Sequence, residues 1–144
     1  MRLDDMLQND YLMRMILQLT IAIQQSLNLQ RQDPKADAEE IEYLVGEAVG
    51  IDAGLLFSLS PESIVSMLQL GNFDEALSGY VLRSMYYESD LLESIGQRKS
   101  ADLRRSQADA IARAYGIEIG SEDLSEEALR EFFSTEEEEE GRSL

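Results

Sequence analysis

The N-terminal part of the chain, from Asp4 to about Arg31, carries apolar residues at the spacing of an α-helix. Successive apolar positions are three or four residues apart, which places their side chains on one helical face. The members of this first stripe are Leu12, Ile16, Leu19, Ile23 and Leu27. The pattern predicts one long amphipathic helix that packs against the rest of the chain.

A second, narrower apolar stripe on the same segment consists of Met13, Leu17 and Ile21. At about 100° per residue it points away from the first stripe, and uncharged Gln and Asn residues border it. A helix with apolar residues on two sides is usually packed on two sides. Either the rest of the domain sheathes this helix, or the second stripe is a self-association surface. We therefore treat these three residues as a candidate interaction surface.

The remainder of the chain predicts further helices, separated by Pro, Gly and Ser signals. Asp33-Pro34 and Ser60-Pro61 are typical helix starts, because the side chain caps the helix and Pro suits its first turn. The predicted helices cover residues 34–49, 61–70, 73–95, 98–115 and 126–133, with one further turn at 55–58. No strict alternation indicates a strand. The sequence predicts an all-α, single-domain bundle of about six helices over residues 1–134.

The segment "LGNFDEAL", residues 70–77, reads as a corner between two of these helices. Gly71 suits the left-handed conformation that follows a helix end. Asn72 is the expected cap of the next helix, and the acidic pair after Phe73 favours its positive N-terminal end. The sequence therefore predicts a helix–turn–helix corner here.

This corner resembles the tetratricopeptide repeat, a helix–turn–helix unit that stacks into peptide-binding superhelices. The resemblance covers about Leu70–Tyr80, with Gly71 as the turn glycine, Ala76 as the small residue between the helices and Tyr80 as the aromatic one turn later. The departures from the repeat pattern are Ile64, Arg83 and Glu88. Similar turns recur 25 residues apart instead of 34, so the chain does not read as an array.

The opening "NDYLMRMI" also resembles the start of an uncharacterised bacterial all-helical family. The residues that carry this resemblance are Asn9, Asp10, Tyr11, Arg14 and Ile16. It implies an all-helical fold with a tetratricopeptide-like remainder, and a function that is itself unknown.

The composition excludes much chemistry. The chain has no His and no Cys, which removes His-based acid–base catalysis, thiolate nucleophiles and the usual zinc sites. The net charge of −17 opposes binding to nucleic acids and to anionic membranes. The longest uncharged run, Met15–Gln30, is too short and too polar to span a bilayer. We expect a cytoplasmic protein without a cofactor, whose acidic end, residues 135–144, forms a mobile tail.

Two carboxylates of the second predicted helix, Glu39 and Glu42, lie three residues apart and face similarly. Such a pair is able to hold Mg²⁺ through bound phosphates. All-helical nucleotide pyrophosphohydrolases use Glu-x-x-Glu and Glu-x-x-Asp pairs, but this chain contains no Glu-x-x-Asp. A magnesium-dependent phosphohydrolase is therefore the alternative function, and a solvated acidic helix face is the simpler interpretation.

A basic island interrupts the acidic chain. Its members are Arg98, Lys99, Arg104 and Arg105. We expect them to meet acidic residues of the protein itself, on the second helix or in the tail, and the alternative is a docking patch for an acidic partner. The adjacent Tyr86 and Tyr87 diverge on a helix, so we expect one ring to be buried and the other to line a groove.

These observations favour a non-catalytic module for protein–protein interaction or self-association. Its working surface would be the second stripe or a groove beside Tyr86 and Tyr87. The expected partner is a protein or peptide, with a homodimer as one form, and neither nucleic acid nor membrane. A structural subunit of a larger assembly is the remaining alternative.

Overall fold

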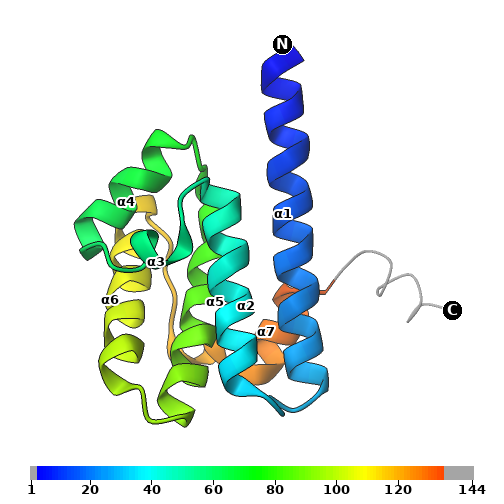
Figure 1. Ribbon diagram of the computed structural model, residues 1–144, viewed down its shortest axis with the longest axis vertical. Helices are drawn as coiled ribbons and strands as arrows, with labels where there is room; N and C mark the ends of the chain where they lie inside the picture. Colours follow the sequence, from blue (N-terminus) through cyan, green and yellow to red (C-terminus); the bar gives the residue numbers. More distant parts are fainter. Residues whose placement is uncertain (1–2, 135–144) are drawn as a thin grey trace, which may run out of the picture.

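Four long helices lie side by side in the order α1 (Leu3–Asn28), α2 (Pro34–Val49), α5 (Glu75–Ser94) and α6 (Arg98–Tyr115) (Figure 1). Each packs mainly on its neighbours in this row, so α1 and α6 are the outer members. The shorter elements are α3 (Ala53–Leu56), α4 (Pro61–Leu70), the 3₁₀ turn η1 (Ser121–Leu124) and α7 (Glu126–Phe132). The predicted all-α fold in a single domain is confirmed.

The structure, a computed structural model, describes the backbone of residues 3–134 and the side chains of residues 10–134. Every regular element in this range is helical. Among the described helices, none is both long and apolar enough to cross a membrane. The predicted acidic tail, residues 135–144, lies outside the described residues.

Helix boundaries follow the capping signals of the sequence. The predicted bounds of α2, α4 and α6 match the observed ones. Asp33 Oδ1 accepts from the Ala36 amide at 3.2 Å, and Ser60 Oγ accepts from the Ser63 amide at 3.2 Å. Each cap is followed by a proline at the first helical position, which is where proline is tolerated.

The corner between α4 and α5 differs from its prediction. Asn72 takes the left-handed conformation, with φ of 59°, whereas Gly71 has φ of −81°. Asn is one of the few residues besides glycine that tolerates this region. The cap of α5 is Asp74, whose Oδ1 accepts from the Leu77 amide at 2.8 Å, and Phe73 before it is buried. α4 packs mainly against α6, and the tetratricopeptide resemblance stays a prediction.

One face of α1 contributes to the core, as the first stripe predicts. Its residues Leu19, Ile23 and Leu27 are fully buried, and they belong to the same apolar cluster as side chains of α2, α5, α6 and α7. At the C-terminal end of α1, α7 packs alongside, and Arg130 donates to the Leu27 carbonyl at 2.7 Å. These contacts fix the rotation of α1 about its own axis.

Candidate interaction surface

The second stripe faces outward from the row of helices. Met13 is 60% exposed, Leu17 50% and Ile21 41%, although neighbouring first-stripe residues of α1 are buried. The expectation that the domain itself sheathes both sides of α1 is therefore wrong for the described residues. The physical reason is the position of α1 at the end of the row, where helix neighbours lie on one side only.

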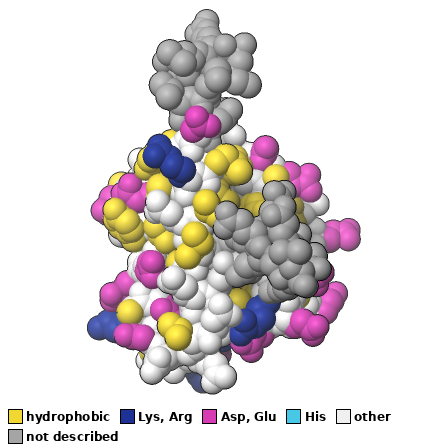
Figure 2. Space-filling model, turned by 90° about the vertical axis from the view of Figure 1, so that its right-hand side faces the viewer, with side chains coloured by type: hydrophobic (Ala, Val, Ile, Leu, Met, Phe, Trp, Pro, Cys, Tyr) yellow, Lys and Arg dark blue, Asp and Glu magenta, His cyan; other side chains and the backbone are white. Residues whose placement is uncertain are grey.

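The face that carries the second stripe is weakly charged. Viewed from the α1 side, yellow hydrophobic side chains gather along the middle of the surface, and charged side chains lie mostly toward its edges (Figure 2). Between Tyr11 and Asn28 the sequence of α1 has no acidic residue and one basic residue, Arg14. This stretch is unusual in a chain of net charge −17.

The other end of the row has a different outer face. Exposed residues of α6 include Asp102, Arg105 and Arg113, which are charged, and α4 packs on part of this helix. A charged outer face is well solvated by water and needs no partner. An apolar outer face is unfavourable in water, because its exposure raises the free energy of the protein. The two ends of the same row therefore differ in what they can bind.

Polar contacts flank the second stripe and hold α1 in position. The Tyr11 hydroxyl donates to the backbone oxygen of Glu47 at 3.3 Å and to its side chain at 3.2 Å. Toward the other end, the Gln24 amide donates to the carbonyl of Phe133, just after α7. The stripe is thus presented on a helix that its own domain anchors at both ends.

Tyr86 and Tyr87 do not belong to this surface. Both are buried, and the expectation that one ring lines a groove is wrong. The Tyr86 hydroxyl donates to Asp109 of α6, and the Tyr87 hydroxyl lies 2.5 Å from the Ser26 hydroxyl of α1. Both rings are covered because α5 is an inner member of the row, with packed neighbours on several sides.

The predicted basic patch is divided by burial. Arg98, Lys99 and Arg105 are exposed, but Arg104 is only 4% exposed and lies inside the domain. As a four-residue surface patch the prediction is wrong, since Arg104 points inward. The expected pairing with an acid of the second helix is confirmed for Arg104, whose Nη2 lies 2.8 Å from Glu42 Oε1.

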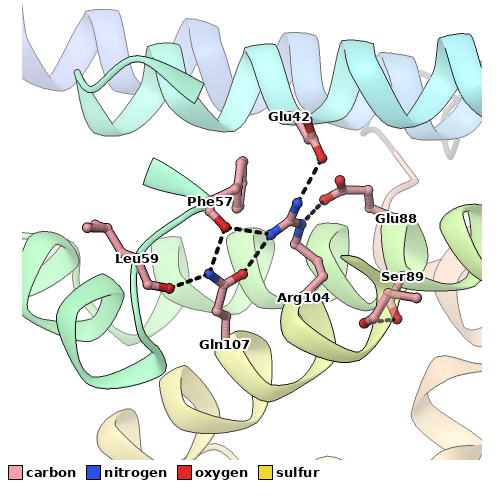
Figure 3. Close-up of polar contacts among 8 residues, drawn as sticks. Glu42, Phe57, Leu59, Glu88, Ser89, Arg104 and Gln107 are labelled. Atoms are coloured by element: carbon pink, nitrogen blue, oxygen red, sulfur yellow. Dashed lines mark hydrogen bonds and ion pairs between the residues drawn. The ribbon is translucent and has the colours of Figure 1, made fainter. Parts of the chain in front are cut away.

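Arg104 is the centre of a buried polar junction (Figure 3). Besides Glu42 of α2, it donates through Nε to Glu88 Oε1 of α5 at 2.8 Å and through Nη1 to Gln107 Oε1 at 2.7 Å. Gln107 in turn donates to the carbonyls of Phe57 and Leu59, at 3.1 and 2.8 Å. The junction ties three helices of the row to the segment that follows α3.

Beyond the pairing of Arg104 with an acid of α2, this buried junction is not among the sequence predictions, although a signal for it exists. Arg104 and Gln107 share the helical face of Ala101, Ala108 and Ile111, all of which are buried. Polar residues at core positions of an amphipathic helix predict buried hydrogen bonds, because an unpaired polar group there is costly. The acidic partners are too far along the chain for sequence spacing to identify them.

The pKa values of the two carboxyl groups of the junction are shifted in opposite directions. Burial and a hydrogen bond with Glu42 raise the pKa of Glu88 well above its ordinary value, against the opposing charge of Arg104. Burial opposes ionisation of Glu42 as well, but the hydrogen bond from Glu88 and the guanidinium of Arg104 lower its pKa. The second oxygen of Glu88 is buried and points toward Glu42 (Figure 3). A proton on this oxygen leaves one cation and one anion in the junction.

The carboxylate pair proposed for Mg²⁺ is not assembled as a site. Glu42 binds Arg104, whereas Glu39 is exposed. Among the described residues, no group of three or more acidic side chains is placed to hold a metal ion. The structure therefore adds no support to the phosphohydrolase alternative.

A hollow of about 480 Å³ lies between the N-terminal part of α5 and α7. Its wall includes Arg83, Ile117 and Phe132, with Asp74 and Glu75 also part of its lining. The Arg83 guanidinium donates to the Gly79 carbonyl at 3.1 Å and lies 4.1 Å from the Phe132 ring centre. Since its own chain already engages this cation, we do not assign a ligand to the hollow.

Comparison with models of protein families, with curated proteins and with solved structures finds no match to this chain. The assignment of function therefore depends on the geometry described above.

Proposed function

We propose that this protein is a non-catalytic interaction module that binds another protein through the second stripe of α1. The observation that carries the proposal is the contrast within one helix. Its inner face is buried in the core, while Met13, Leu17 and Ile21 on its outer face are 41 to 60% exposed. Covering such side chains removes apolar area from water, which stabilises a complex by about 25 cal/mol per Å² before the costs of association.

A helix is the partner element that suits this surface. Residues spaced by four along a helix form a ridge, and ridges of this kind pack into the grooves of a second helix. The polar contacts of Tyr11 and Gln24 hold the ridge in place before binding. A surface that is already ordered loses little conformational entropy when a partner binds.

The test is affinity capture from the source cells with three tagged forms of the full chain. These are the natural protein, Leu17→Asp, and Leu70→Asp as a matched control at an exposed leucine of α4. We expect the natural protein and Leu70→Asp to retain the same protein, its own chain included, and Leu17→Asp to lose it. The proposal is wrong if all three forms retain the same set of proteins.

A further inference from the structure

The N-terminal turns of α1 extend beyond the bundle. α1 has 26 residues and α2 has 16, and the contact of Tyr11 with Glu47 lies near the limit of their shared length. The preceding turns of α1 rise above the other described helices (Figure 1). Helices in proteins are stabilised mainly by tertiary packing, so a neighbour alongside this overhang would stabilise it.

The second stripe is symmetric about its middle residue. Met13 and Ile21 lie four residues before and after Leu17. In a two-fold, antiparallel pair of α1 helices centred on Leu17, Met13 of each copy faces Ile21 of the other. The same pairing places residues 3–10 of each copy beside residues 24–31 of the other. One partner thus covers the second stripe, and each overhang runs beside the end of the other copy's α1, where Phe133 and Arg130 already contact Gln24 and Asn28.

The distribution of charge favours a second copy of the chain over a basic partner at this surface. Two chains of net charge −17 repel one another, and they approach at least cost where neither carries acidic residues. The stretch of α1 from Tyr11 to Asn28 meets this condition, since its one charged residue is Arg14. A basic partner would instead be drawn to the acidic parts of the surface.

We infer that the partner of the second stripe is the second stripe of another copy, in an antiparallel homodimer with its two-fold axis at Leu17. This inference rests on the proposed function, because it names the partner of the same surface. Three half-exposed side chains cover far less than the about 800 Å² per partner of a standard interface. The dimer is therefore weak and forms as protein concentration rises.

Site-specific crosslinking tests both the contact and its direction. The chain has no cysteine, so Met13→Cys, Leu17→Cys, Ile21→Cys and the control Leu70→Cys each introduce a unique thiol. With a short bis-maleimide, we expect Leu17→Cys to link to itself several-fold more than Leu70→Cys. In a mixture of tagged Met13→Cys and untagged Ile21→Cys, links between the two variants should exceed links between two Met13→Cys chains several-fold. Added salt should raise the yield, because it screens the repulsion between acidic copies.

Two results would overturn the inference. Links between two Met13→Cys chains that equal or exceed the mixed links would exclude the antiparallel pair. A yield for Leu17→Cys no higher than for Leu70→Cys would exclude self-association through this surface. If either result is found but the chain captures a different protein, and Leu17→Asp abolishes that capture, the proposed function holds without the homodimer. If no such protein is captured, the proposed function and the homodimer are both rejected.

Discussion

Arg104 of α6 donates a hydrogen bond to the buried carboxyl group of Glu88 of α5, with 2.8 Å between Nε and Oε1. The same guanidinium reaches Glu42 of α2, so one side chain connects three of the four helices in the row. α1 has no part in this junction, and its inner face is held mainly by apolar packing. The interior junction and the outer stripe can therefore be altered separately.

Replacing Arg104 with methionine should destabilise the fold strongly. The substitution keeps most of the apolar stem but leaves Glu42, Glu88 and Gln107 without their donor. Removing one member of a buried ion pair costs about 3–5 kcal/mol. Arg105→Met is the matched control, since Arg105 is half-exposed and its pair with Asp90 is worth less than about 1 kcal/mol. Urea denaturation of the two variants measures the difference, and equal losses would contradict a structural role for the junction.

Glu88 should make the stability fall as the pH rises. Its pKa is raised in the folded protein, so the folded state holds a proton that the unfolded state releases. The stabilising contribution is complete below the unfolded pKa, about 4.3, and is lost as the pH rises through the folded pKa. Burial is the main cause of the shift, and Glu42 and Arg104 are the charged groups that face Glu88.

Glu88→Gln isolates this effect because glutamine imitates the protonated carboxyl group. The free energy of unfolding of the natural protein, relative to Glu88→Gln, should decrease with rising pH above about 5. Glu93→Gln, at an exposed position of the same helix, controls for the loss of one acidic group. Denaturant titrations across a pH series provide the measurement. A difference that stays constant with pH would show that Glu88 is ionised in the folded state.

Gly46 should not tolerate a side chain. A Cβ atom at this position in α2 would lie 2.9 Å from the Ile51 carbonyl oxygen and 3.1 Å from Cα of Ala53. Because these are backbone atoms, overpacking should cost about 1–3 kcal/mol, partly offset by the better helix propensity of alanine. Gly54→Ala is the control, since its nearest neighbour is the movable end of Asp52 at 3.3 Å. Thermal unfolding should show a lower midpoint for Gly46→Ala, and equal midpoints would refute this explanation.

Local signals in the sequence predict the helices well. The starts of α2 and α4 are specified by a capping residue followed by proline, and their predicted bounds match the structure. The sequence predicts the corner after α4 less well, since both Gly and Asn tolerate the left-handed conformation and the structure gives it to Asn72 instead of Gly71. The sequence of a helix is therefore enough to predict that the helix forms. The residues at which it begins and ends depend also on its surroundings.

The site was only partly predictable for a related reason. The direction of the second stripe follows from helical geometry, and the structure places Leu17 on the outer face as expected. Whether a residue of an inner helix is covered depends on which elements surround it. The spacing of Tyr86 and Tyr87 does not show which elements surround them, so it does not predict that both rings are buried. In the same way, the basic neighbours of Arg104 in the sequence do not show that its side chain points inward.

Sedimentation equilibrium of the natural protein, Leu17→Asp and Leu70→Asp over a wide concentration range tests the central claim most directly. The account predicts that the average mass of the natural protein and of Leu70→Asp rises toward that of a dimer, while Leu17→Asp stays monomeric. Since Leu17 is half-exposed, all three proteins should unfold at similar urea concentrations. A natural protein that remains monomeric throughout, or a Leu17→Asp variant that associates equally well, would contradict it.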